Sequence, residues 1–195
     1  MTDRALFRPF ETDLDEGQAL AILRGAVAGA DDGELFLERR RSESLVFDDG
    51  RLRNASYDSG EGFGLRAVVG DVAGYAHSTE LSEAALRRAS ETTRLAALAP
   101  PPARTNRRLY GDFDPFEGPD FSSRVGTLAE IDDYLRGRDG RVVQATASLA
   151  ASIQEIEILR PEGMRFAESR PLTRMNVSVI VEKDGRRESG SAGMG

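Results

Sequence analysis

The sequence predicts an α+β fold in which largely antiparallel β-meanders are flanked by a few helices. In two stretches, apolar residues recur at steps of three and four, which is typical of helices that bury one face. Most of the remaining chain consists of short runs of β-branched and aromatic residues separated by turn pairs such as Asp-Gly, which is typical of hairpins. Apolar residues make up 39% of the 195, which is enough for a packed core.

The first predicted helix covers residues 13–30. Asp13 and Glu16 have the spacing of a capping pair at its start, and the Gly-Ala-Asp-Asp-Gly run at 29–33 would end it. The apolar stripe of this helix would consist of Ala19, Ile22, Leu23, Ala26, Val27 and Ala30.

A meander of five short strands is expected after this helix. The strands are predicted at 34–41, 44–48, 51–57, 63–69 and 72–78. Three pairs have turn chemistry and would separate them, namely Asp49–Gly50, Ser59–Gly60 and Gly70–Asp71.

A second helix is predicted from Ser82 to about Leu98. Ser82 is a favourable N-cap, and Leu81 and Leu86 are spaced as a hydrophobic staple around it. Three consecutive prolines then begin a connection over 99–122 that has neither helical nor strand periodicity. Long loops inside compact domains are usually functional, and large apolar groups indicate that this one packs against the domain or a partner. Those groups are Leu109, Tyr110, Phe113, Phe116 and Phe121.

The last part of the chain predicts one short helix and a second meander. Thr127 and Glu130 form a capping-box pattern at the start of the helix, and the Arg-Asp-Gly run at 138–140 would end it. Turns are expected at 160–163 and 183–185. The strands are predicted at 142–151, 153–159, 164–167 and 174–181.

These elements predict a three-part organisation. Residues 1–98 hold a helix, a β-meander and a helix, residues 99–122 form the connection, and residues 123–195 hold the short helix and the second meander. We expect the first and last parts to pack together as one N-terminal domain of a longer protein.

Composition excludes several kinds of chemistry. The chain has no cysteine and one histidine, His77, so thiolate sites are excluded and a histidine-rich metal site is not expected. A net charge of −7 argues against a direct nucleic-acid partner, because phosphate binding needs a basic face. The sequence has neither a signal-peptide pattern nor an apolar run long enough to span a membrane. We therefore expect a cytoplasmic protein without a membrane partner.

Several motifs have a structural interpretation that is stronger than a functional one. The glycine-rich run at 60–64 leads into a strand and not a helix, which favours close strand packing over phosphate binding. His77 is expected to be a structural imidazole. The basic triplet at 39–41 is expected to form ion pairs on a strand face. The acidic pairs at 31–32, 48–49 and 132–133 lack calcium-loop spacing and suit turns and helix ends.

A paired-carboxylate site could still assemble across space, but no pair stands out in the sequence. No catalytic, cofactor-binding or metal-binding residue is assigned.

Three stretches resemble the N-terminal part of the TldD/PmbA family. They are ESLVFDDGRLRNAS from Glu43, GFGLRAVVGDVAG from Gly62, and the pair ATASLAASIQEIEILRPEG and RPLTRMNVSVIVEKDGRRESGS between Ala145 and Ser191. The last pair is similar to the TldD branch.

The resemblance implies a cytoplasmic zinc metallopeptidase whose TldD subunit pairs with a PmbA-type (TldE) subunit around a cavity for flexible, unfolded peptides. The family's H-E-x-x-x-H zinc motif is absent from this sequence, so no family ligand or catalytic residue falls on any position. We expect zinc in a missing C-terminal half, no cofactor in this segment, and no hydrolysis by this segment alone. The family's description as a modulator of DNA gyrase would then reflect an indirect route through proteolysis.

Two functions follow. The first is a non-catalytic region that helps to form the substrate cavity and the subunit interface, with a strand such as 174–181 pairing with an extended peptide. The second is a stand-alone acidic protein-binding module that uses the aromatic side chains of Tyr110, Phe113 and Phe116.

Overall fold

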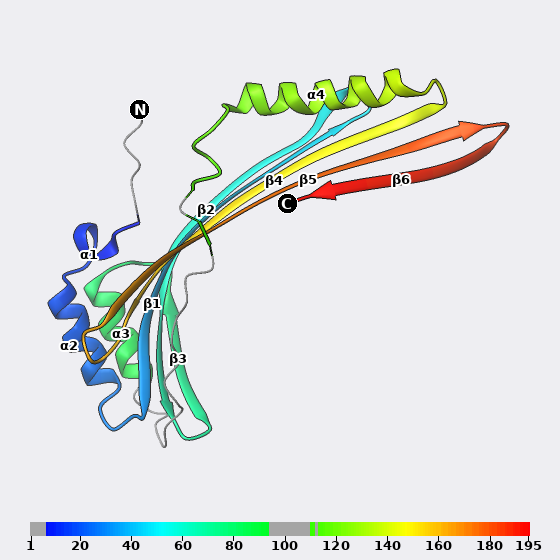
Figure 1. The fold of residues 1–195 in the computed structure, drawn as a ribbon. Coiled ribbons are helices and arrows are strands. Elements are labelled where there is room, and N and C mark those ends of the chain that lie inside the picture. The colour runs from blue at the N-terminus through cyan, green and yellow to red at the C-terminus, as the bar shows by residue number, and fades with distance from the viewer. Residues whose placement is uncertain (1–6, 94–109, 112) are drawn as a thin grey trace. The chain divides into compact units, whose positions relative to one another are not determined.

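The computed structural model describes residues 7–93, 110–111 and 113–195, and within them it contains a six-stranded sheet of order β3-β2-β1-β4-β5-β6 (Figure 1). The strands are β1 (Asp32–Asp48), β2 (Arg51–Val69), β3 (Val72–Ser78), β4 (Val142–Leu159), β5 (Arg165–Lys183) and β6 (Arg186–Met194). The helices are α1 (Pro9–Thr12), α2 (Glu16–Ala26), α3 (Glu83–Thr93) and α4 (Phe121–Arg138). The predicted α+β class, with an antiparallel sheet and a few helices, is confirmed.

Tight turns set the strand pairing. Asp49 and Gly50 join β1 to β2 with φ of 53° and 77°, and Asp184 and Gly185 join β5 to β6 with φ of 53° and 78°. Two consecutive positive φ angles are typical of the type I′ turn, whose twist matches that of an antiparallel hairpin. Both predicted turns are therefore confirmed, as is the turn at Gly70, whose φ is 60°.

The strands are longer than the sequence predicts. The runs expected at 34–41 and 44–48 form the single strand β1, and in the same way two predicted runs merge in each of β2, β4 and β5. The predicted Ser59–Gly60 turn is wrong, because both residues lie inside β2 and Gly60 has no positive φ. The predicted edge role of 174–181 is also wrong, because β5 lies between β4 and β6. The sheet ends instead at β6, which was not predicted.

The helix starts differ from the predicted ones in two places. Asp15, and not Asp13, caps α2 by accepting a hydrogen bond from the Gln18 backbone N–H at 2.8 Å. Asp120 caps α4 in the same way, so the predicted start at Thr127 lies inside the helix, where its hydroxyl donates to the Ser123 carbonyl. Local capping chemistry favoured a nearby aspartate over the capping-box pattern in both cases.

Other helix predictions hold. Ser82 accepts a hydrogen bond from the Ala85 backbone N–H at 3.2 Å, which confirms the predicted cap of α3. The predicted continuation of this helix beyond Thr93 lies outside the described residues, as does Leu109. The division into 1–98, 99–122 and 123–195 stays a prediction.

Residue contacts divide the chain into two compact units. Unit 1 lies within Met1–Arg40, Gly60–Tyr110 and Gln154–Ser169, and unit 2 within Arg41–Ser59, Gly111–Ile153 and Arg170–Gly195. The fully buried leucines of the unit 1 core come from helices α2 and α3 and from three strands. They are Leu23, Leu35, Leu37, Leu65, Leu86 and Leu159.

Unit 2 has a smaller core between α4 and the sheet. Leu128 of α4 is fully buried against Leu45, Phe47 and Ala147, and Val177 packs against this cluster. Because successive side chains of a strand point to opposite faces, the neighbours of Ala147 and Val177 lie on the sheet face opposite α4. That face is polar and carries the candidate site.

Two glutamates of β4 are buried in unit 1. Glu155 accepts hydrogen-bonded ion pairs from Arg39 at 2.9 and 3.0 Å. Glu157 lies 3.1 Å from the Nε of Arg165, which also pairs with Glu16 at 2.9 Å. Burial raises the pKa of the Glu157 carboxyl above its ordinary value, and the negative charges of Glu11 and Glu16 raise it further. The positive charges of Arg165 and Arg8 lower it, but the net shift is upward.

Replacing Glu157 by glutamine is expected to stabilise the protein at neutral pH. A group whose pKa is raised in the folded state contributes its full stability at pH values below its pKa in the unfolded state, which is about 4.3 for glutamate. This contribution is lost as the pH rises through the pKa in the folded state. Glu157→Gln keeps a neutral side chain at every pH, so its free energy of unfolding should exceed that of the wild type at pH 7 and match it below pH 4. Urea unfolding across this pH range measures both.

The matched control for this prediction is Glu155→Gln on the same face of β4. It weakens the pairing of Arg39 and should lower the free energy of unfolding at pH 7. Equal effects of the two substitutions would contradict the account.

Glycine at position 62 is required by the close approach of β3 to β2. A Cβ at Gly62 would lie 2.5 Å from the Ser78 backbone oxygen, whereas a Cβ at Gly60 would meet nothing within 4 Å. Gly62→Ala is therefore expected to lower the free energy of unfolding by about 1–3 kcal/mol. Gly60→Ala, on the same strand, should leave it unchanged or slightly raised. Equal denaturation midpoints for the two variants would show that the predicted clash is absent.

Candidate functional site

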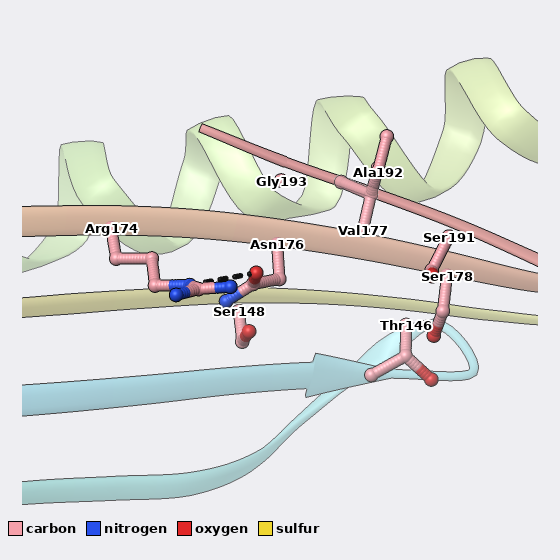
Figure 2. A pocket seen from close by; sticks show the side chains of 9 residues that line it. All are labelled: Thr146, Ser148, Arg174, Asn176, Val177, Ser178, Ser191, Ala192 and Gly193. Atoms are coloured by element: carbon pink, nitrogen blue, oxygen red, sulfur yellow. Dashed lines mark hydrogen bonds between the residues drawn. The ribbon is translucent and has the colours of Figure 1, made fainter. Parts of the chain in front are cut away.

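A pocket of about 230 Å³ lies in unit 2 on strands β4, β5 and β6 (Figure 2). Most of its side chains share the sheet face opposite α4, whereas those of Val177 and its cross-strand partner Ala192 lie on the α4 face. The lining residues are Thr146, Ser148, Arg174, Asn176, Val177, Ser178, Ser191, Ala192 and Gly193. Polar groups predominate, and no carboxylate is among them.

The register of the β5–β6 hairpin brings the polar residues together. Asn176 is opposite Gly193, and Ser178 is opposite Ser191, so the two hydroxyl groups are cross-strand neighbours (Figure 2). A Cβ at position 193 would lie 2.5 Å from the Oδ1 of Asn176. Glycine at 193 therefore leaves the space that the Asn176 side chain occupies.

Arg174 and Asn176 orient each other. The Nε of Arg174 donates to the Oδ1 of Asn176 at 3.0 Å (Figure 2). Since this bond uses the amide oxygen, the Asn176 amide presents its N–H₂ group as a donor. The planar guanidinium is held by its Nε edge, and its Nη atoms have no hydrogen-bond partner among the described residues.

Asp48, which accepts a hydrogen bond from the lining residue Thr146, is already satisfied on the same face. Gln144 donates to it at 3.0 Å and Thr146 at 2.7 Å, and the Nε of Arg53 lies 3.4 Å away. The hydrogen bond from Gln144 lowers the pKa of the Asp48 carboxyl most, followed by the hydrogen bond from Thr146. The charge of Arg53 lowers the pKa further, and these effects together outweigh partial burial, which raises it. The carboxylate therefore stays ionised and engaged.

This arrangement suits binding more than bond cleavage. The lining offers serine and threonine hydroxyls but no histidine, lysine or carboxylate that could act as a general base toward them. It does offer several hydrogen-bond donors and one cation, which is the chemistry of an anion site.

The motifs noted in the sequence have structural roles. His77 is exposed on β3 and stacks on Tyr75 at a ring distance of 5.8 Å. Gly64 leaves room for the Tyr75 ring, since a Cβ there would lie 2.5 Å from the tyrosine hydroxyl. Gly62 and Gly64 of the glycine-rich run thus serve close strand packing, as predicted, whereas Gly60 faces open space.

The basic triplet at 39–41 forms ion pairs, as predicted. Arg39 pairs with Glu155, and Arg41 pairs with the buried Asp114 at 2.6 Å. The Arg41 guanidinium also lies over the Phe116 ring, 5.3 Å from its centroid.

The acidic pairs also have structural partners. Asp31 accepts from the Gly70 backbone N–H, and Arg160 pairs with Asp32. Arg136 pairs with both Asp49 and Asp132. Across residues 7–93, 110–111 and 113–195, no three His, Asp or Glu side chains gather in a metal-binding group.

The aromatic residues of the connection do not form one surface. Phe116 packs edge-on against Tyr57 at 6.1 Å and beneath Arg41, so it anchors its segment to unit 2. Phe113 is 50% exposed and Tyr110 is 38% exposed.

The sequence does not predict the pocket. The polar alternation of Asn176 and Ser178 against Val177 was the available signal, but it did not show that Ser191 and Gly193 lie beside them, because β6 was not predicted. No helix in the described part of the chain is long and apolar enough to cross a membrane.

Two family models match the chain. The PmbA/TldA metallopeptidase domain 1 matches residues 33–97, and the PmbA/TldA metallopeptidase central domain matches residues 114–195.

Curated relatives agree with these models. The chain is 30% identical over 174 residues to the metalloprotease TldD homolog of Haemophilus influenzae, covering 85% of this chain and 36% of that protein. It is 28% identical over 188 residues to the homolog of Buchnera aphidicola subsp. Acyrthosiphon pisum, covering 93% and 39%. The chain thus spans well under half the length of these relatives.

Solved structures share the fold. TldE from Thermococcus kodakarensis matches with a TM-score of 0.71 and 14% identity, over 90% of this chain and 42% of that one. A Thermotoga maritima protein described as a proposed modulator of DNA gyrase matches with a TM-score of 0.74 and 14% identity, over 92% and 42%. Together with the family models and the curated relatives, this likeness shows that the chain belongs to the TldD/PmbA family and corresponds to its N-terminal portion.

Proposed function

We propose that this chain is the N-terminal, non-catalytic region of a TldD-type zinc metallopeptidase that processes flexible peptides in the cytoplasm. The observation that carries the proposal is the match of residues 33–97 and 114–195 to the first and central metallopeptidase domains, in a sequence with a single histidine. In this role the chain helps to form the substrate cavity and the subunit interface.

The residues present do not fit the family's zinc. His77 is exposed and its ring stacks on Tyr75, and no group of three potential ligands accompanies it in the described residues. No catalytic step is therefore assigned to this chain, and zinc is proposed for the remainder of the protein.

The sheet supports a role in holding extended peptides. Strand β6 is an edge of the sheet, and its residues from Arg186 to Met194 are exposed. An edge strand presents unpaired N–H and C=O groups that can bond an extended peptide irrespective of its sequence. The polar face opposite α4 is also suited to line a water-filled cavity.

The proposed protein partner is a PmbA/TldE-type subunit. The fold similarity to a TldE protein supports it, because it indicates that the two branches share this N-terminal architecture. Two neighbours of known structure are described as proposed modulators of DNA gyrase. The net charge of −7 favours an indirect effect on DNA gyrase over direct binding of DNA.

A stand-alone acidic protein-binding module remains the second candidate. The 50% exposure of Phe113 favours it, since an exposed aromatic side chain is a common contact in interfaces. Phe116 is excluded from that surface by its contacts with Arg41 and Tyr57.

The non-catalytic role predicts that the chain does not hydrolyse peptides. The 195-residue chain, incubated with an unstructured peptide whose two ends are blocked, should leave the peptide intact by mass spectrometry, with or without added Zn²⁺. Cleavage that Zn²⁺ stimulates and a chelator abolishes would contradict the proposal.

The peptide-holding role predicts protection of β6. Addition of the same blocked peptide should slow amide hydrogen exchange by about tenfold or more at alternating residues between Arg186 and Met194, because only every second N–H of an edge strand faces outward.

The matched control is β3, the opposite edge of the sheet, where exchange rates at Val72–Ser78 should not change. Protection at β3 alone, or at neither edge, would count against the assignment of β6.

A further inference from the structure

We propose that the pocket on β4, β5 and β6 binds a carboxylate group, and that in a bound peptide this group is the C-terminal carboxylate. Carboxylate binding is inferred from the pocket's own chemistry, whereas the assignment to a peptide end rests on the proposed function.

The hydrogen-bonding groups of the pocket match those of a carboxylate. The Nη atoms of Arg174, the amide N–H₂ of Asn176 and the hydroxyls of Ser148, Ser178 and Ser191 can all donate. A carboxylate accepts through about four lone-pair positions and donates nothing, so it matches this set. A cationic ligand would be repelled by Arg174, and a donor-rich ligand could pair with the hydroxyls but would leave the N–H groups of Arg174 and Asn176 without an acceptor.

The acceptors that could compete with a ligand carboxylate are occupied. Asn176 Oδ1 accepts from Arg174, and Asp48 accepts from Gln144 and Thr146. Neither the Asn176 amide oxygen nor the Asp48 carboxylate is therefore free to satisfy the pocket's donors in place of a ligand carboxylate. The positive charge of Arg174 is therefore not neutralised by an acid of the pocket.

The Arg174 guanidinium is preorganised for a ligand. The hydrogen bond at 3.0 Å to Asn176 holds the Arg174 guanidinium by its Nε edge, so less side-chain freedom is lost when a ligand binds its Nη atoms. Gly193 makes this geometry possible, because a Cβ there would displace the Asn176 side chain. The turn at Asp184 and Gly185 fixes the register that places Gly193 opposite Asn176.

The size of the pocket indicates what carries the carboxylate. A volume of about 230 Å³ exceeds what a lone carboxylate fills, and it leaves room for the residue that bears it. A terminal residue of a peptide, with its carboxylate on Arg174, suits a pocket of this size.

The test compares N-acetyl-triglycine with its C-terminal amide, using the isotopically labelled 195-residue chain and NMR shift mapping. The acid should shift the amide signals of residues 174–178 and 191–193 and bind at least about tenfold more tightly than the amide, since charge-assisted hydrogen bonds are worth more than neutral ones. Because these probes are too short to need the edge of β6, the result is independent of the blocked-peptide exchange experiment.

Two pairs of variants separate the pocket from general charge and packing. Arg174→Gln should weaken binding of the acid at least about tenfold, whereas Arg51→Gln, the same charge change on exposed β2, should change it less than about twofold. Gly193→Ala should weaken binding of the acid, because the added Cβ displaces Asn176. Gly190→Ala, on the same strand, should not weaken it, because a Cβ at position 190 meets nothing within 4 Å.

Three results would overturn the proposal. One is equal binding of the acid and the amide. Another is full binding by both Arg174→Gln and Gly193→Ala, each checked for an unchanged circular dichroism spectrum. The third is binding of inorganic phosphate at the pocket without any binding of the acid. Binding of the acid in a chain whose β6 shows no peptide protection would support the carboxylate site and refute only the peptide-holding role.

Discussion

The alternation of side chains along paired strands is the constraint on which the rest of this structure depends. In unit 2, Ala147 and Val177 point toward α4, and their neighbours therefore form the polar face that carries the pocket. A slip of one residue between strands would exchange the two faces. The positive φ angles at Asp184 and Gly185 prevent that slip by specifying a two-residue turn. Turn chemistry thus fixes the partners of Arg174 and Asn176.

The proposed binding role is compatible with membership of a metallopeptidase family. The pocket offers donors and a cation but no general base, and its hydroxyls have no activating partner in the lining. The buried glutamates of unit 1 are engaged by Arg39 and Arg165 and do not form a reactive pair. Such groups suit a region that holds a substrate while another part of the protein supplies the chemistry.

Local patterns predicted the features that depend on local chemistry. The cap at Ser82 and the turns at Asp49–Gly50 and Asp184–Gly185 are properties of a few adjacent residues, and they were predictable. The continuity of β2 through Ser59 and Gly60 was not, because pairing with β1 holds this polar run extended, whereas β3 pairs only with Phe63–Val69. Strand β6 has no β-branched or aromatic residue and exists through pairing with β5. The pocket needs that pairing, so the sequence alone did not predict it.

The most direct test of the account is an experimental structure of the chain bound to an extended peptide with a free C-terminus. The account predicts that the peptide lies along β6 as an additional strand and that its carboxylate is within hydrogen-bond distance of the Nη atoms of Arg174. A peptide held at β3, or one whose carboxylate points into solvent away from Arg174, would contradict it.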